Sequence, residues 1–353
     1  MKKLFLEDCC EILDSMRVPI TASDRKSGPY PYYGANGIQD YVADYIFDDE
    51  LVLLAEDGGN FGSKTKPIAY RVSGKCWVNN HAHVLKPKES FNVDYLCYSL
   101  MFYNTDGLVN GATRQKLTQA TMRQMLIPQR TYQEQCDTVA QLNKVNLLIK
   151  TRQQQLRKLD ELVKARFVEL FGNPVINNKG WNVSDLGQLT IKIGSGATPK
   201  GGKEAYQTDG ISLIRSMNVH NGKFEYKELA HISDEQAARL ENVAVEENDV
   251  LLNITGASVA RSCVVPTNVL PARVNQHVCI IRCKDSIMPD FINSLLIDDN
   301  YQDLLWSIAG SGATREAITK QQVESLQIIL PPISKQEEFS KFINRVDKSK
   351  VVA

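Results

Sequence analysis

The chain lacks any apolar run long enough to cross a membrane. Its longest apolar runs, near Val250–Leu252 and Gln327–Leu330, fall far short of the roughly 20 residues that a spanning helix needs. Two lysines open the sequence, but Glu7 and Asp8 follow before an apolar segment develops, which excludes a signal peptide. These absences predict a cytoplasmic protein, and its 8 cysteines are expected to be reduced thiols.

An excess of charge of one sign is also missing. The 41 basic and 41 acidic residues balance, so the overall charge does not point to nucleic acid. Locally, seven Lys and Arg residues stand against two acidic residues between Gln141 and Arg166. A solvated helix face explains this local excess as well as a nucleic-acid contact does.

Motifs of nucleic-acid enzymes are absent. An adenine amino-methyltransferase needs an Asn/Asp-Pro-Pro-Tyr/Phe stretch, whereas the one Pro-Pro pair, Pro331–Pro332, precedes an isoleucine. Gly196–Lys203 is not a phosphate loop, because Gly202 occupies the lysine position and Glu204 follows. The sequence therefore predicts no catalytic residue in this chain.

A metal site is not indicated either. His277, Cys279 and Cys283 alternate along one expected strand, but no second group of ligands stands at the spacing that zinc sites use. A structural strand is the simpler interpretation. We expect no metal and no cofactor in the chain itself.

Glycine and proline are absent from Tyr132 to Phe171, a stretch rich in good helix formers. It predicts one helix of about 60 Å, ended by Gly172–Asn173–Pro174. With about 150 residues on each side, a spacer between two domains is favoured over a core helix of one large domain.

Apolar residues recur along this helix every seven residues and form a seam that needs a partner helix. The seam consists of Leu142, Val145, Ile149, Leu156, Leu159, Val163 and Leu170, interrupted by Arg152 and Arg166. Near the end of the chain, Phe339, Ile343 and Val346 form a shorter seam in a second helix that starts near Lys335.

The flanking regions mix short strands with turns and helices. Strands are expected at Leu51–Ala55, Trp77–Leu85, Ile211–Arg215, Val250–Ile254 and Val274–Cys283, and helices at Val93–Tyr103 and Pro289–Ile308.

Four segments of the first half recur in the second half in the same order. Gly111–Arg114 recurs as Gly312–Arg315 at a separation of 201, and Pro128 with Gln133–Glu134 recurs as Pro331 with Gln336–Glu337 at 203. Val78–His81 recurs as Val274–His277 at 196, and Val52–Leu54 recurs as Val250–Leu252 at 198. The chain is a tandem duplication of a globular unit and a helix.

The second helix is expected to have about half the length of the first, because at an offset of 203 the last residue, Ala353, corresponds to Lys150. In an antiparallel pair it covers only about Thr151–Phe171. Leu142, Val145 and Ile149 are then left for another partner, either a methyltransferase subunit or a second copy of this chain.

This order of repeats resembles the specificity (S) subunit of Type I restriction-modification enzymes. The resemblance lies in the Gly-Ala-Thr-Arg turns, the Ile127–Pro128 and Leu330–Pro331 helix starts, and Glu169–Pro174 followed by Trp181. Tyr32–Gly37 and Gly194–Pro199 also look like elements of the recognition domains of this family.

The resemblance implies an α+β fold in which two α/β target-recognition domains alternate with long helices that pair as an antiparallel coiled coil. The implied domains are 1–130 and 174–332, with the helices at 131–173 and 333–353. It further implies a non-catalytic subunit that binds a bipartite site on double-stranded DNA. Methyltransferase (M) and restriction/translocase (R) subunits would be its partners, and S-adenosylmethionine, ATP and Mg would be bound by those partners. A coiled-coil scaffold that binds protein instead of DNA is the alternative.

Candidate DNA-binding residues follow from the hydrogen-bonding chemistry of base edges and phosphates. They are Tyr33, Asn36, Lys64, Lys66 and Arg114 in the first half, and Lys200, Lys203, Arg215, Asn218, Arg261 and Arg315 in the second. The duplicated Arg114 and Arg315 fit a phosphate contact and a structural tie between turn and helix equally well. Asn79, His81, Asn275 and His277 favour a structural role, because residues that read different targets should differ between the units.

Overall fold

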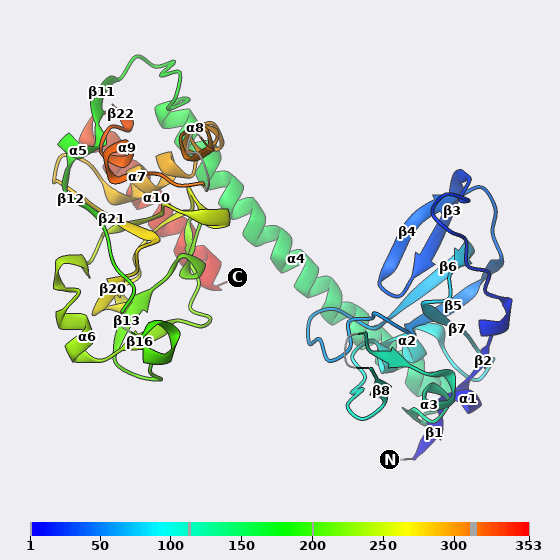
Figure 1. Ribbon diagram of the computed structural model, residues 1–353. Coiled ribbons are helices and arrows are strands. Elements are labelled where there is room, and N and C mark those ends of the chain that lie inside the picture. Colours follow the sequence, from blue (N-terminus) through cyan, green and yellow to red (C-terminus); the bar gives the residue numbers. More distant parts are fainter. Residues whose placement is uncertain (1, 112–113, 200, 311–315, 353) are drawn as a thin grey trace. The chain divides into compact units, whose positions relative to one another are not determined.

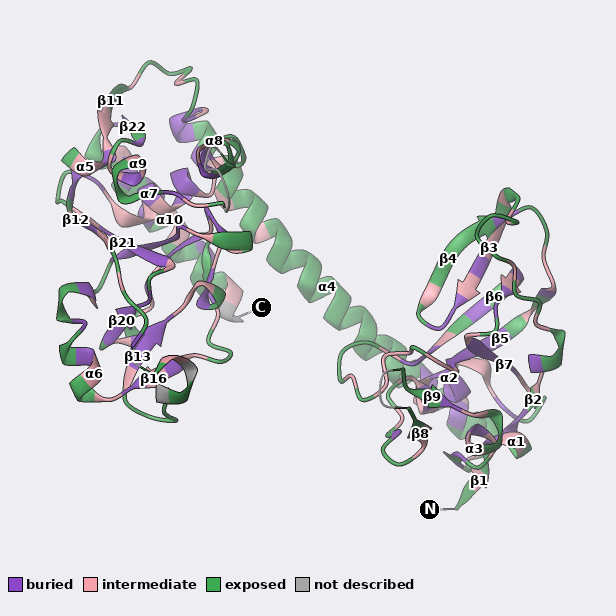
Figure 2. Ribbon diagram, viewed as in Figure 1, coloured by how far each residue is buried: buried purple, intermediate pink, exposed green. Residues whose placement is uncertain are grey.

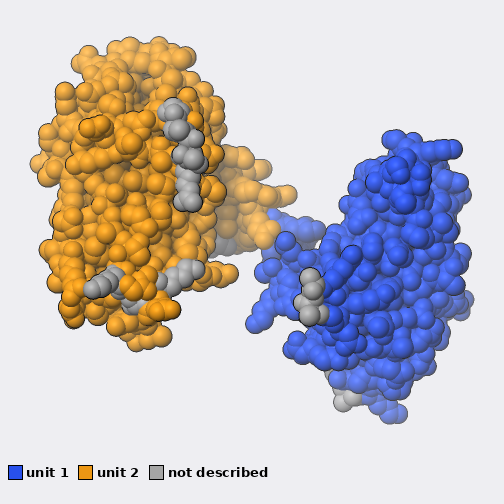
Figure 3. Space-filling model, viewed as in Figure 1, with its two compact units in different colours: residues 1–151 blue, residues 152–353 orange. Residues whose placement is uncertain are grey.

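The computed structural model describes residues 2–111, 114–199, 201–310 and 316–352. The chain divides into two compact units, Met1–Thr151 and Arg152–Ala353, and each is described here by itself (Figure 3). Helix α4 runs from Tyr132 to Phe171, as predicted, and contributes its first part to the first unit and the rest to the second (Figure 1). Within the described ranges, no helix combines the length and apolarity needed to span a membrane.

The first unit is built around a six-stranded sheet of order β2-β7-β5-β6-β3-β4. In chain order it contains β1 (Lys3–Phe5), α1 (Leu6–Cys9), β2 (Cys10–Ile12), β3 (Ser27–Gly34), β4 (Gly37–Val42), β5 (Phe47–Ala55), β6 (Ala69–Val78), β7 (Ala82–Pro87), α2 (Val93–Met101), β8 (Val109–Asn110), β9 (Lys116–Leu117), α3 (Gln119–Arg123) and β10 (Leu126–Pro128). Strands β1 and β10 pair with each other, as do β8 and β9.

Strand β5 is apolar at every position of Leu51–Ala55 because both of its faces are covered. Val52 and Leu54 point into a core that includes α2 and Val139 of α4. The alternating residues Leu51 and Leu53 belong to a second cluster on the other face. Helix α2 and the start of α4 thus pack onto one face of the sheet.

The prediction of one strand at Trp77–Leu85 is wrong, because the chain turns between β6 and β7. The Asn79 side-chain oxygen accepts a hydrogen bond from the His81 backbone N–H at 2.8 Å, which closes a tight turn. Asn275 forms the same turn with His277 at 3.1 Å and separates two strands within the predicted Val274–Cys283.

The second unit has two four-stranded sheets, β12-β21-β18-β19 and β16-β13-β20-β17, with the short pairs β11-β22 and β14-β15. Its strands are β11 (Asn182–Asp185), β12 (Thr190–Ser195), β13 (Ile211–Ile214), β14 (Val219–His220), β15 (Lys223–Phe224), β16 (Ala230–Ile232), β17 (Ala244–Val245), β18 (Val250–Asn253), β19 (Ser262–Val264), β20 (Ala272–Val274), β21 (Val278–Cys283) and β22 (Gln327–Leu330). Its helices are α5 (Leu186–Leu189), α6 (Asp234–Ala238), α7 (Pro289–Leu296), α8 (Asp299–Gly310), α9 (Lys320–Glu324) and α10 (Ile333–Val352).

The predicted helix Pro289–Ile308 is interrupted and forms α7 and α8. Between them, the Asp298 carboxylate accepts hydrogen bonds from the backbone N–H groups of Asn300 and Tyr301 at 3.0 and 3.3 Å. An aspartate that takes these N–H groups starts a new helix, so the chain changes direction there.

Helix α10 packs on the last part of α4 in the opposite direction. Arg166 of α4 pairs with Glu338, whereas Asp160, earlier in α4, pairs at 2.8 Å with Lys350, later in α10. The predicted antiparallel helix pair is therefore confirmed for the part of α4 that lies in the second unit.

Four phenylalanines form the centre of this helix pair. Phe339 of α10 lies 5.6 Å from Phe167 and 5.4 Å from Phe171, measured between ring centroids, and Phe291 of α7 completes the cluster. Phe167 and Phe171 were not assigned to the seam, because the strict seven-residue count placed Arg166 and Leu170 there. A straight helix of 3.6 residues per turn drifts against that count.

The predicted seam is covered unevenly along α4 (Figure 2). Leu170 is buried, and Val163 packs against the core, as do Phe339 and Ile343 of α10. In contrast, Leu142, Val145, Ile149 and Leu156 are exposed, and so are Leu147 and Leu148. Val145 is 51% and Leu148 63% accessible to solvent.

The structure corrects the offset of the repeat at the second helix. Gln135 and Gln336 are the equivalent pair. Each is 1% exposed and accepts a hydrogen bond from the residue just before α2 or α7, Asn92 N at 2.8 Å and Met288 N at 2.9 Å. This equivalence has an offset of 201 rather than 203. Ala353 then corresponds to Arg152.

We expect Phe339→Ala to lower the free energy of unfolding of the second unit by about 3–5 kcal/mol, because it leaves a cavity among three other rings. The change is measured by urea denaturation followed through Trp181, which donates a hydrogen bond to the Phe171 carbonyl at 2.9 Å. Ile333→Ala, an exposed position of the same helix, is the control and should change little. A loss below about 1 kcal/mol for Phe339→Ala would contradict the packing described above.

Candidate nucleic-acid interface

Both units have the same backbone arrangement where the central strand ends. In the first unit, Leu117 N–H donates to the Glu56 carbonyl at 2.7 Å, and Gly58 N–H donates to the Gln115 carbonyl at 3.2 Å. In the second, Ile318 N–H donates to the Ile254 carbonyl at 2.8 Å, and Gly256 N–H to the Glu316 carbonyl at 2.9 Å. The segment that follows each Gly-Ala-Thr-Arg sequence is thereby fixed to the sheet.

The turns with Asn79 and Asn275 lie beside these fixed segments. His81 Nδ1 is 2.6 Å from an Asp57 carboxylate oxygen, and His277 Nδ1 is 2.5 Å from the Thr255 hydroxyl. The backbone geometry is therefore repeated, whereas the group that faces each histidine differs between the units.

Arg114 lies at this edge of the first unit. Its guanidinium contacts an Asp57 carboxylate oxygen at 2.8 Å and His81 Nδ1 at 3.3 Å, and its side chain remains 59% exposed. The position agrees with both earlier interpretations, since the same side chain ties the turn to the sheet and reaches solvent. Its counterpart, Arg315, lies outside the described residues.

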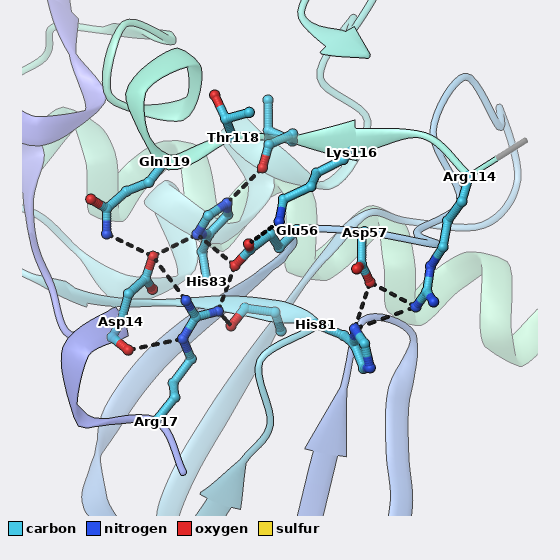
Figure 4. Close-up of polar contacts among 12 residues, drawn as sticks. Asp14, Arg17, Glu56, Asp57, His81, His83, Arg114, Lys116, Thr118 and Gln119 are labelled. Atoms are coloured by element: carbon cyan, nitrogen blue, oxygen red, sulfur yellow. Dashed lines mark hydrogen bonds and ion pairs between the residues drawn. The ribbon is translucent and has the colours of Figure 1, made fainter. Parts of the chain in front are cut away.

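A network of charged groups underlies Arg114 (Figure 4). His83, fully buried in β7, lies 2.6 Å from Asp14, and Arg17 lies 2.7 Å from Glu56. Lys116, the second residue after Arg114 along the chain, lies 3.0 Å from the other Glu56 oxygen, and Gln119 donates to Asp14 at 2.9 Å. Sequence reasoning missed this network, because its members come from four separate segments.

The network sets the protonation of its carboxylates. Burial by itself would raise the pKa of Asp14, but hydrogen bonds from His83, Val84 N–H and Gln119, together with the charge of His83, lower it below its ordinary value. Burial would also raise the pKa of Glu56, but hydrogen bonds from Arg17 and Lys116 outweigh this effect. The pKa of Glu56 is therefore lowered as well. Both groups are therefore carboxylates at neutral pH.

Asp14, Glu56 and His83 have the composition of a metal site, and their ligand atoms lie within 4.8 Å of one another. However, Arg17 contacts both carboxylates, and Lys116 pairs with Glu56. A cation there would have to displace a buried guanidinium, so we interpret the group as an ion network.

The second unit replaces three charged members of this network. At the positions equivalent to Glu56, His83 and Lys116 stand Ile254, Cys279 and Ala317. The edge is instead hollowed by about 450 Å³, and Arg261, His277 and Thr255 are among the residues that line the hollow. Arg261 and His277 therefore lie at the same hollow of this edge.

The remaining candidates of the first unit are more dispersed. Asn36 is exposed and donates to the Gly58 carbonyl at 3.0 Å, so it belongs to the Arg114 edge. Lys64 and Lys66 are exposed on the loop after β5, and Lys64 lines a separate hollow of about 440 Å³. Tyr33 is partly buried against Tyr70, and burial raises the pKa of its hydroxyl.

Two candidates of the second unit have structural contacts. Asn218 is fully buried and donates to the Glu225 carbonyl at 2.9 Å, so its amide does not reach the surface. Arg215 stacks over Tyr206 and donates to the Glu228 carbonyl. Lys200 and the side chain of Lys203 lie outside the described residues.

Comparisons with known proteins agree on one family. A model described as the type I restriction modification DNA specificity domain matches residues 1–160 and 178–351. A protein of Haemophilus influenzae named as a type I restriction enzyme specificity subunit is 26% identical, over 97% of this chain and 86% of its own length. A specificity subunit of Methanocaldococcus jannaschii is 21% identical, over 75% of this chain and 64% of its own.

Solved structures share the fold. The S subunit of the type I restriction-modification system of M. genitalium gives a TM-score of 0.58 at 11% identity, with 99% of this chain and 90% of that chain covered. A chain from a structural study of the assembly and conformational transition of the type I R-M system gives 0.54 at 16% identity, with 99% and 91% covered.

We expect Asp14→Asn to lower the free energy of unfolding of the first unit by about 1.5–3 kcal/mol at neutral pH. A carboxyl with a lowered pKa in the folded state stabilises it above the unfolded value near 3.9 and loses this contribution as the pH falls. The difference from the unsubstituted chain should therefore shrink as the pH falls below that unfolded value. The measurement is urea denaturation followed by Trp77, with the more exposed Glu50→Gln as the control. A pH-independent difference would contradict the role of the charge.

Proposed function

Because the matching model covers residues 1–160 and 178–351, the chain belongs to the type I restriction-modification DNA specificity family, and we propose that each unit reads one half of a bipartite DNA target. The chain is a DNA-sequence-recognition subunit, and its family is a non-catalytic component of the restriction-modification complex. The scaffold alternative, without DNA specificity, is not favoured by these relatives.

The observation that carries the two-half proposal is the pair of repeated edges with different side chains. Backbone hydrogen bonds place Leu117 and Ile318 identically on their sheets. The side chains beside these positions differ. They include Arg114 and Lys116 in the first unit, and Arg261 and His277 in the second. Two edges of the same build and different chemistry suit two different base sequences.

The domain limits of this proposal are 1–130 and 174–332 for the two readers, with 131–173 and 333–353 as the helices between and after them. Methylation and cleavage are assigned to M and R subunits, which would bind S-adenosylmethionine, ATP and Mg. This chain would serve by selecting the target.

The exposed part of α4 is proposed as a docking site for a helix of the methyltransferase subunit. At the corrected offset of 201, Leu142 and Val145 correspond to Ile343 and Val346. In α10 those two positions are partly and largely buried, and Ile343 packs against the core that α4 helps to form. The stripe on α4 therefore has the side-chain spacing of a helix-binding surface. Burial of each large side chain in that interface would contribute about 1.5–3 kcal/mol to the free energy of binding.

The function is tested by mapping adenine methylation at single-base resolution in cells that express this chain with its methyltransferase partner. We expect a two-part methylated motif that is absent from cells lacking this chain. An Arg114→Ala variant should alter methylation through the half of the motif that the first unit reads. A methylated motif without a second part would contradict the two-half proposal.

The same assignment predicts salt-sensitive DNA binding. Each phosphate contact contributes a slope of about −0.9 to the dependence of log affinity on log salt concentration. Binding of the assembled complex to DNA is measured by fluorescence anisotropy at increasing salt. DNA binding that is absent at low salt, in a complex that remains assembled, would favour the scaffold alternative.

For the docking site, we expect the double variant Val145→Glu and Ile149→Glu to abolish co-purification with the methyltransferase subunit, because charges would be buried in the helix interface. Gln154→Glu is the matched control, since nine residues place it on the opposite side of the helix from Val145. Co-purification that survives the double variant would exclude this stripe. Loss of self-association instead of M binding would identify a second copy as the occupant.

A further inference from the structure

His83 is fully buried, and both of its ring nitrogens face hydrogen-bond acceptors. Nδ1 lies 2.6 Å from a carboxylate oxygen of Asp14, and Nε2 lies 3.0 Å from the backbone carbonyl oxygen of Leu117. A neutral imidazole donates from one nitrogen only. The other nitrogen would then direct a lone pair at an oxygen, which is repulsive, so a carboxylate at Nδ1 and a carbonyl at Nε2 are both bound when both nitrogens carry a proton.

The charges around the ring lead to the same state. The groups that face it are Asp14 at its Nδ1, Glu56 at 3.6 Å, and Arg17, which contacts both carboxylates. These side chains are at most 13% exposed, whereas that of Lys116 is 50% exposed. Because Lys116 pairs with Glu56 at 3.0 Å, a proton on His83 is favoured by the direct contact of its Nδ1 with the Asp14 carboxylate and not by the charge count of the network.

The hydrogen bond to Leu117 connects this charge to the proposed DNA edge. Leu117 belongs to β9, directly after Lys116 and three residues after Arg114. The Gln119 amide, on the other side of Leu117, also binds the Asp14 carboxylate. The segment 114–119 is thus bound to the buried network at Leu117 and Gln119, while the side chains of Arg114 and Lys116 remain 59% and 50% exposed.

We propose that His83 is a positioning residue, a buried imidazolium that holds the Arg114–Gln119 segment in the arrangement that binds DNA. This inference rests on the proposed function of the edge. When the ring loses the proton on Nε2, the hydrogen bond to Leu117 is lost and the two basic side chains lose their fixed position. DNA binding through the first unit therefore weakens at alkaline pH.

The second unit provides an internal comparison. Cys279 replaces His83 there, yet Ile318 keeps the backbone bond to Ile254 that Leu117 makes to Glu56. The fold of the edge thus forms without a buried charge. His277, at this edge of the second unit, faces the Thr255 hydroxyl and the Gln276 amide nitrogen, and a neutral ring satisfies both.

The protonation state is measured directly by nitrogen NMR of the full chain with labelled histidines. We expect both ring nitrogens of His83 to show the protonated signal at about pH 7.5, with the resonance assigned by its loss in His83→Gln. A neutral His83 tautomer under these conditions would overturn the inference. This measurement needs no DNA, so its failure leaves the proposed function untouched.

The positioning role is measured by DNA affinity of the assembled complex between about pH 6.5 and pH 8.5. We expect the affinity of the unsubstituted complex to fall about tenfold more than that of His83→Gln, as for the loss of one hydrogen bond from a charged donor. His231→Gln, in β16 of the second unit and outside both edges, is the control and should keep the original pH profile.

Three outcomes separate the two proposals. A pH profile that is unchanged in His83→Gln, in a complex that still binds its target, overturns the role of His83. A flattened profile in His231→Gln would also overturn it, because the titrating group would then be His231. No target binding by the unsubstituted complex at any pH would overturn the proposed function instead.

Discussion

One buried glutamine amide, used once in each unit, joins the long helices to the globular parts. Gln135 accepts a hydrogen bond from Asn92 N–H and donates to the carbonyls of Ser90 and Arg130. Gln336 accepts from Met288 N–H and donates to the Pro331 carbonyl. Because an unsatisfied buried amide costs about 1–3 kcal/mol, the start of each long helix can lie only where these partners are. The packing of α4 on the first core and of α10 on the second follows from this constraint.

Much of the architecture could be predicted from local chemistry. The absence of Gly and Pro specified α4 to its last residue, and Gly172, with a φ of +78°, ends it as expected. Features decided by tertiary contacts could not be predicted. The Asn79 turn and the Asp298 helix start interrupt two segments that were each predicted as one element. The repeat offset at the second helix was also wrong. It was set by the identity of Pro128 and Pro331, whereas the burial that identifies Gln135 as the equivalent of Gln336 is not visible in the sequence.

The site was only partly predictable, for a related physical reason. Arg114 and Arg261 could be chosen because cations bind phosphate and lie on loops. Asn218 was chosen by the same chemistry, but its amide is needed inside the fold. The network around His83 connects residues as far apart as Asp14 and Gln119, and no sequence spacing reveals such a contact. Comparison of the units shows that this network is additional to the fold, since Ile254 and Cys279 occupy the same places without charge.

The charge along α4 narrows what can cover its exposed apolar stripe. Five Lys and Arg residues, and no acidic residue, lie between Thr138 and Leu159. Two copies of this segment paired in antiparallel fashion would place only cations along both flanks of the seam, and like charges across a helix interface are destabilising. α10 does not meet this difficulty, because it packs where Asp160 and Glu169 accompany Arg166 and supplies Glu338 itself. The helix that fits residues 142–156 is therefore one whose apolar seam is flanked by Asp and Glu, which favours a different subunit over a second copy of this chain.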